Sequence, residues 1–224
     1  GDASVIRTLR RLLYQNGGLV VCVADDPAMH SSQNEQDSRH YAIAAKLPML
    51  EPSDSAEARD FAKAAFALSE TYDTPVLLRM CTRIAHSQSI VELEEREVRT
   101  LPAYTRDPAK YIMTPANATK KHPLVEERTR KLTEYAEFCP FNRVEMGGTK
   151  LGILCSGTCY QYIKEVFGDS VSVLKLGLVN PLPVQKIRDF AAQVDRLVVV
   201  EELDGIIEQH CASIGVTVEG KSLF

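Results

Sequence analysis

The sequence lacks any long apolar segment. No apolar run approaches the about 20 residues that a membrane span requires, and the N-terminal residues show no hydrophobic core of a signal peptide. The formal charge is −4 over 224 residues, which removes the usual reason to expect nucleic acid or an anionic membrane as a partner. We therefore expect neither partner and a cytoplasmic location.

Cysteines are few, and their spacing fits no metal or iron–sulfur motif. No two of the six cysteines have the two-residue separation of such motifs, and no Cys or His set completes a site around Cys155 and Cys159. We expect no metal and no iron–sulfur cluster on this chain. Cys22 and Cys155 lie in apolar runs, where cysteine usually packs as a small hydrophobe. The pattern is typical of a reduced chain without a disulfide framework.

Nucleotide-binding and hydrolase motifs are missing as well. The sequence has no G-x-G-x-x-G after a strand, no G-x-x-x-x-G-K-[ST] phosphate loop and no G-x-S-x-G elbow. The hydrophobic pattern therefore predicts a fold class, while no common motif predicts the function.

The first half has the strand–helix–strand pattern of a parallel α/β sheet. The apolar run 19–24 predicts a strand covered on both faces, and flanking prolines make 48–52 extended. A helix capped by Ser53 or Asp54 then precedes a strand at 76–80. The apolar stripe of this helix has 3.6-residue spacing: Phe61, Ala64, Ala65 and Leu68.

The rest of the chain divides into a linker and a second α/β unit. Residues 92–148 are charge-dense at first and rich in proline, with one predicted helix over 122–138, and we interpret them as a linker between domains. Strands alternating with helices follow, in a second βαβαβ pattern. We predict an α/β fold of two three-layer units with parallel or mixed sheets. The predicted domains are residues 1–91, 92–148 and 149–224.

A loop of unusual length and polarity follows the first strand. Residues 25–40, DDPAMHSSQNEQDSRH, form this polar loop, whereas connectors in compact α/β domains have a median of about 4–6 residues. The polar loop and the segment 155–159 both follow strands, at the sheet edge where ligands of α/β proteins bind. Ser, Asn and Asp are also ordinary loop formers because they bond their own backbone. Composition alone leaves both interpretations open.

Several strings together resemble the alpha subunits of indolepyruvate ferredoxin oxidoreductases, members of the thiamine-diphosphate-dependent 2-oxoacid:ferredoxin oxidoreductase family. The resemblance runs colinearly from residue 17 to about 221, and its most specific part is the polar loop. It is carried by GGLVVCVADDPAMHSSQNEQDSRHYA, LPMLEPSDSAEARDFAKAAFALSE, TPVLLRMCTRIAHS, LGILCSGTCYQYIKE, VLKLGLVNPLP and LVVVEELDGIIEQ.

The resemblance implies a part of a larger enzyme. Residues 1–91 would hold part of a pyrimidine-binding domain, and 149–224 a truncated transketolase C-terminal-like domain. Thiamine diphosphate with Mg²⁺ would be completed by segments that this sequence does not contain, and iron–sulfur clusters would belong to the full subunit. The implied reaction oxidises and decarboxylates aryl 2-oxo acids such as indolepyruvate, with coenzyme A as acceptor and ferredoxin taking the electrons. Implied partners are a beta subunit, a second copy, or both.

Within the polar loop the resemblance assigns roles to particular residues. His30, Ser31, Ser32 and Gln33 would be catalytic. Thiamine diphosphate would be bound by Asp26, Ser32, Gln33 and Asn34, and the substrate by Ser31 and Arg39. Arg39 has a second interpretation, in which it only pairs with Asp37 inside the loop.

Other polar residues are expected to have structural roles. Arg79, Arg83 and His86 are interpreted as ordinary residues at a strand end. Glu201 and Glu202 are adjacent on a strand and face opposite ways, so we expect helix capping or an interface rather than an acid–base pair. Lys175 is expected at a strand edge or an interface.

Two alternatives to the enzyme interpretation remain open. The isolated chain, which we expect to be inactive alone, would be a non-catalytic interaction or structural module. It would otherwise be a transketolase-like protein, against which the Ser-Ser-Gln-Asn-Glu string argues.

Overall fold

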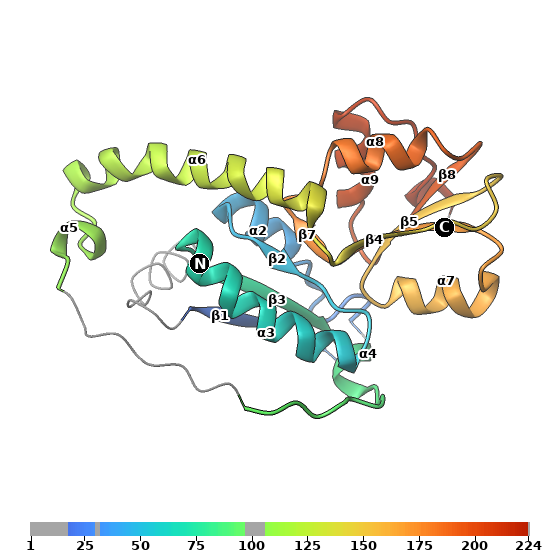
Figure 1. Ribbon diagram of the computed structural model, residues 1–224, viewed down its shortest axis with the longest axis horizontal. Coiled ribbons are helices and arrows are strands. Elements are labelled where there is room, and N and C mark those ends of the chain that lie inside the picture. Colours follow the sequence, from blue (N-terminus) through green and yellow to red (C-terminus); the bar gives the residue numbers. More distant parts are fainter. Residues whose placement is uncertain (1–17, 30–31, 97–105, 224) are drawn as a thin grey trace.

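A computed structural model describes residues 18–29, 32–96 and 106–223 (Figure 1). It contains two four-stranded sheets, each with helices against both faces. The predicted α/β class is therefore confirmed. Among the described residues, no helix combines the length and the apolar character needed to cross a membrane.

The first unit is built on the sheet β1-β3-β2-β7. Its strands are β1 (Val20–Asp25), β2 (Met49–Leu50), β3 (Val76–Cys81) and β7 (Leu178–Asn180). β1 and β2 run parallel to β3, and β7 is antiparallel to β2. The helices are α2 (Arg39–Ala45), α3 (Ser55–Tyr72) and α4 (Thr82–His86).

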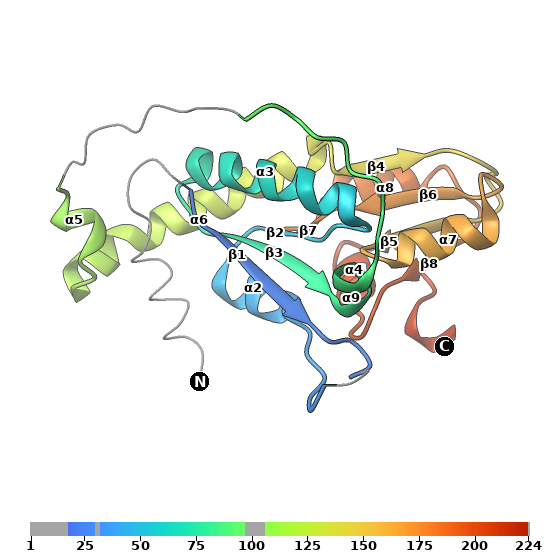
Figure 2. The same cartoon turned by 90° about the horizontal axis from the view of Figure 1, so that it is seen from below.

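Alternation along β3 places side chains on both faces of this sheet. Val76 and Leu78 pack with Phe61 of α3, whereas Leu77 packs with Ala42 of α2. Figure 2 shows α3 and α2 on opposite sides of the strands. Asp54 caps α3 by accepting a 2.8 Å hydrogen bond from the Glu57 N–H, as the sequence predicted.

The second unit is built on the sheet β4-β6-β5-β8. Its strands are β4 (Asn142–Glu145), β5 (Gly152–Ser156), β6 (Ser172–Leu176) and β8 (Leu197–Val200). β5 pairs in parallel with β6 and β8, and β4 is antiparallel to β6. Helix α7 (Cys159–Phe167) covers one face, and α8 (Gln185–Ala191) and α9 (Ile206–Ser213) cover the other (Figure 1). The chain ends in a short 3-10 helix, η1 (Lys221–Leu223).

The chain does not divide cleanly between the two sheets. β6 and β7 are separated only by Gly177, yet they belong to different sheets. A Cβ at Gly177 would lie 2.7 Å from the Phe141 carbonyl oxygen and 2.8 Å from the Phe61 ring, so the crossing requires the smallest side chain. Residues 92–148 hold more than the one predicted helix, because α5 (Pro108–Tyr111), α6 (Pro115–Phe138) and β4 all lie there. The domain boundaries themselves stay a prediction.

One prediction about β1 is wrong. The strand was expected to be covered on both faces, but Cys22 and Ala24 are exposed. β1 is the outermost strand of its sheet among the described residues, and the helices cover its two faces unequally. The expectation that cysteine packs as a buried hydrophobe holds for Cys155, on the central strand β5, and fails for Cys22.

Candidate functional site

The two sheets meet where their parallel strands end. β1 ends at Asp25 and β3 at Cys81, while β5 ends at Ser156 and β8 at Val200. The Cys81 Sγ lies 3.9 Å from the Oγ1 of Thr158, which follows β5. Ligands of α/β sheets bind outside the carboxyl ends of strands. The polar loop therefore starts at the junction of the two units.

A buried ion-pair network holds the polar loop on the first unit. The Arg79 guanidinium, on β3, donates from Nε to Asp25 Oδ2 over 2.6 Å and from Nη1 to Glu51 Oε1. Asp25 also accepts a 2.8 Å hydrogen bond from the Ser38 N–H, so one carboxylate holds both ends of the loop. Burial would lower the pKa of Arg79, but the charges of Glu51 and Asp25 raise it above its usual value. This agrees with the structural role expected for Arg79.

Arg39 connects the polar loop to the second unit. Its Nε donates to Asp37 Oδ1 over 2.9 Å, and its Nη1 donates to Glu201 Oε2 over 2.6 Å. Its Nη2 donates to the carbonyl oxygens of Glu202 and Asp204, over 2.7 and 2.9 Å. The guanidinium is only 1% exposed. The pairing of Arg39 with Asp37 is thus confirmed, and its contact with substrate stays a prediction.

The charge state of this pair follows from its surroundings. Burial alone would raise the pKa of Asp37, but the hydrogen bond and charge of Arg39 outweigh burial and lower it. For Arg39, burial would lower the pKa, but the hydrogen bond that it donates to Asp37 and the charges of Glu51, Asp37 and Glu201 raise it. Both groups are therefore ionised at neutral pH, and each stabilises the charge of the other.

Glu201 has two structural roles and Glu202 a third. The Glu201 carboxylate accepts hydrogen bonds from the Ile207 N–H over 3.0 Å and from the Glu208 N–H over 3.1 Å, so it caps the start of α9. The same carboxylate also pairs with Arg39. The Glu202 Oε1 accepts a 3.0 Å hydrogen bond from the Thr158 hydroxyl. The expected capping and interface roles are both confirmed.

The remaining predicted site residues lie between positions 26 and 34 of the polar loop. Asp26 is half-buried and accepts a hydrogen bond from the Thr82 hydroxyl at the start of α4. Ser32 is half-buried, whereas Gln33 and Asn34 are exposed. His30 and Ser31 lie outside the described residues. The structure thus places Asp26 against α4, and it leaves the donors at 33 and 34 on the surface of this chain.

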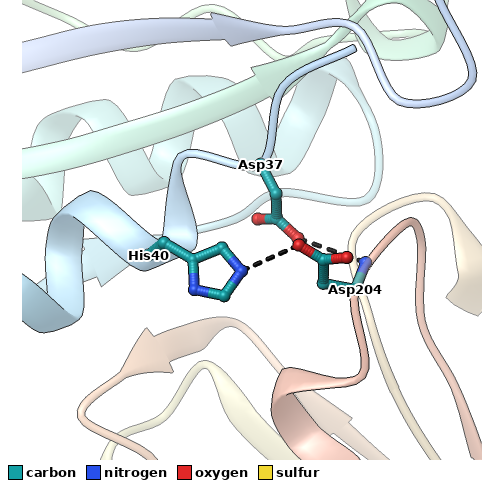
Figure 3. Close-up of side chains that lie close together, drawn as sticks. All are labelled: Asp37, His40 and Asp204. Carbon is teal, nitrogen blue, oxygen red and sulfur yellow. Dashed lines mark hydrogen bonds and ion pairs between the residues drawn. The ribbon is translucent and has the colours of Figure 1, made fainter.

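A cluster of three possible metal ligands spans the two units (Figure 3). The His40 Nε2 lies 2.8 Å from Asp204 Oδ2, and one oxygen of Asp37 lies within 4.8 Å of both. Both oxygens of Asp37 already accept hydrogen bonds from Arg39. The cluster is therefore best described as an ion-paired contact between α2 and the segment before α9.

Sequence reasoning missed one buried ion pair at the junction. Lys175, on the interior strand β6, is fully buried and pairs with Glu57 of α3. Of the two places expected for Lys175, a strand edge is wrong and an interface is right. Burial lowers the pKa of Lys175 and the Glu57 charge only partly offsets this. A lysine inside an apolar strand signals such a pair, although nothing in the sequence identifies its partner.

Comparisons with known proteins give relatives in sequence and solved structures of similar fold. No family model matches the chain. Indolepyruvate oxidoreductase subunit IorA of Archaeoglobus fulgidus is 41% identical over 206 residues, which cover 89% of this chain and 33% of that protein. The subunit IorA of Thermococcus kodakarensis is 38% identical over 224 residues, covering 92% and 35%. The chain therefore spans about one third of the length of these relatives.

A solved structure shares the fold. The 2-oxoglutarate:ferredoxin oxidoreductase from Magnetococcus marinus, with 2-oxoglutarate, coenzyme A and succinyl-CoA bound, superposes with a TM-score of 0.65. The superposition covers 96% of this chain and 46% of that chain, at 14% sequence identity. At this identity the similarity establishes the fold alone.

Proposed function

Because the chain is homologous to one third of indolepyruvate oxidoreductase subunit IorA, we propose that it forms part of an oxidoreductase acting on aryl 2-oxo acids. The proposed reaction decarboxylates indolepyruvate oxidatively to an acyl-CoA and passes the electrons to ferredoxin. The observation that carries this proposal is the 41% identity over 206 residues, which cover 89% of this chain. The fold neighbour supports the substrate class, because it binds a 2-oxo acid and coenzyme A.

The polar loop fits one wall of a thiamine diphosphate site. When bound, this cofactor would supply a nucleophilic carbon that adds to the 2-oxo group and a cationic ring that accepts the electron pair left behind by the departing CO2. Ser32, Gln33 and Asn34 are neutral hydrogen-bond donors in the loop that follows β1, Ser32 being half-buried and the other two exposed. Among the described residues, the one three-ligand cluster, at Asp37, is committed to Arg39. Ligands for Mg²⁺ and the diphosphate would therefore come from other segments of the enzyme.

The loop donors have a physical advantage for decarboxylation. A substrate carboxylate in a full salt bridge is stabilised in the ground state and is lost slowly, because the stabilisation disappears as the charge leaves. Neutral donors such as Ser32 and Gln33 orient the carboxylate without this penalty. Ser31 would share that task. His30 would move a proton near neutral pH. Asp26, held by Thr82, would fix the start of the loop.

Other parts of the enzyme would complete the site. Gln33 and Asn34 are exposed on this chain, and the chain spans one third of its relatives. We propose that a further segment, a beta subunit or a second copy covers the loop and excludes water. The inactive-module alternative is supported by Arg39, whose guanidinium is fully occupied in joining the two units.

A direct assay tests the proposal. The natural full-length protein, purified with its partner subunit, should reduce ferredoxin only when indolepyruvate and coenzyme A are both present. Pyruvate and 2-oxoglutarate should be poorer substrates in the same assay. Reduction with 2-oxoglutarate alone among these acids would contradict the aryl specificity, and no reduction with any of them would favour the module.

A further inference from the structure

A cleft between the two units is lined by residues outside the polar loop, although Thr82 in its wall donates to Asp26 of that loop. It has a volume of about 800 Å³, within the range of about 300–1,000 Å³ that small-molecule sites occupy. Its walls come from the start of α3, from α4 with the segment after it, and from the first turn of α7. Thr82 and Thr158, which follow β3 and β5, lie in it. The cleft therefore occupies the strand-end position typical of α/β ligand sites.

The cleft contains an arginine without an acidic partner. Arg83 is exposed, and among the described residues it forms no ion pair. Its guanidinium lies over the Tyr162 ring, 5.5 Å from the centroid. This cation–π contact crosses from α4 to α7 and fixes the charge at the wall of the cleft. Arg39 and Arg79 are buried against carboxylates, and the more exposed Arg143 pairs with Glu57. Arg83 has no such pair among the described residues, so it is available to an incoming anion.

The remaining lining of the cleft is polar. Hydroxyl and amide groups predominate: Ser53, Thr82, Ser87, Gln88, Ser89 and Gln161. Asp54 is the one carboxylate in the lining, and both of its oxygens are occupied. One accepts from the Glu57 N–H over 2.8 Å, and the other accepts from the Gln161 side chain over 3.0 Å. Asp54 keeps its charge but is held by these donors, which leaves the Arg83 guanidinium to pair with an incoming anion.

We propose that this cleft binds a small organic anion, with Arg83 pairing with a carboxylate or phosphate and Tyr162 stacking on a planar group. An arginine fork matches the geometry of either oxyanion. On the segment after α4, the exposed side chains of Gln88 and Ser89 supply neutral donors. This binding does not require thiamine chemistry, so it stands or falls independently of the proposed function.

The proposal is tested with simple probes on the ¹⁵N-labelled 224-residue chain. Phenyl phosphate carries a phosphate and phenylacetate carries a carboxylate, each attached to a phenyl group. Benzyl alcohol has the same ring without a charge and is the neutral control. Titrations followed by amide chemical shifts should saturate for at least one anion, with a Kd on the order of 1 mM. The shifts should concentrate in α4 and in the first turn of α7, and benzyl alcohol should produce none that saturate.

Variants identify the residues responsible. Arg83→Gln should weaken anion binding by about tenfold or more, the loss expected for one charge-assisted hydrogen bond. Tyr162→Leu should weaken anion binding less than Arg83→Gln does. Comparison of the two variants separates the loss of stacking from the loss of charge. Arg130→Gln, at an exposed arginine of α6, should bind like the parent chain. Saturation by neither anion, or equal binding by the parent chain and Arg83→Gln, would overturn the proposal.

Discussion

Arg39 and Glu201 are 162 residues apart in the sequence and form a buried ion pair of 2.6 Å. Arg39 begins α2 at the end of the polar loop, and Glu201 follows β8 in the second unit. The pair therefore fixes the end of the loop to an element that folds on another sheet. Any function of the loop depends on this contact between the units.

Removal of the Arg39 charge should destabilise the whole chain. Arg39→Met leaves Asp37 and Glu201 buried without their cation, and breaking a buried ion pair in this way costs about 3–5 kcal/mol. The free energy of unfolding from urea denaturation measures the loss. Arg39→Lys should recover only part of it, because an ammonium cannot reproduce the forked contacts.

The control for Arg39 is an arginine paired on the surface. Arg130 lies on α6 and pairs with Glu127 and Glu134, all three side chains being about half exposed. Arg130→Met should leave the unfolding free energy nearly unchanged, because exposed pairs contribute little. Equal losses at positions 39 and 130 would show that the junction network does not hold the two units together.

Gly157 should not tolerate a methyl group. Its φ is +53°, and a Cβ there would lie 2.5 Å from Glu51 Oε1. Glu51 cannot retreat freely, because Arg79 holds the same oxygen. Gly157→Ala should therefore cost more than the about 1–2 kcal/mol of a left-handed backbone alone. Gly215→Ala is the matched control, since its φ is +77° and no atom lies within 4 Å of the added Cβ. A smaller loss at 157 than at 215 in thermal unfolding would contradict the packing described.

Stability should fall in acid through the junction carboxylates. The pKa of Asp37 lies below its ordinary value of 3.8, because the effect of Arg39 exceeds that of burial. A depressed folded-state pKa gives stability that is fully present above the ordinary value and is lost as the pH falls through the folded value. We expect little change from pH 7 to about pH 5 and a decline below that. Asp37→Asn should be less stable at neutral pH and should show a shallower decline in denaturation measured against pH.

The fold followed from the sequence where local patterns suffice. The helix over Ser55–Tyr72, its Asp54 cap and the strand at Ser172–Leu176 agree with the hydrophobic spacing and the capping residues. The pairing of strands that are distant in the sequence could not be predicted from local patterns. β7 belongs to the first sheet, although it follows β6 of the second sheet after a single residue. Because β7 has only three residues, no local sequence pattern identifies the strand with which it pairs.

The site was predictable only in part for the same reason. The polar loop was recognisable by its length and composition, and the Asp37–Arg39 pair by its proximity in sequence. The partners Glu201 and Glu57 were not, because they are held by packing between units. Arg83 was interpreted as an ordinary strand-end residue, and its position in the cleft depends on α7, which begins 76 residues later at Cys159.

Replacement of Gln33 in the complete enzyme tests the central claim that the polar loop serves the reaction. Gln33 is exposed, so Gln33→Ala should change the unfolding free energy by no more than about 0.5 kcal/mol. The rate of ferredoxin reduction with indolepyruvate should nevertheless fall by about tenfold or more, as expected for loss of one donor to a charged group. Gln209→Ala, at an exposed glutamine of α9, should leave both quantities unchanged. Full turnover by Gln33→Ala would contradict the account.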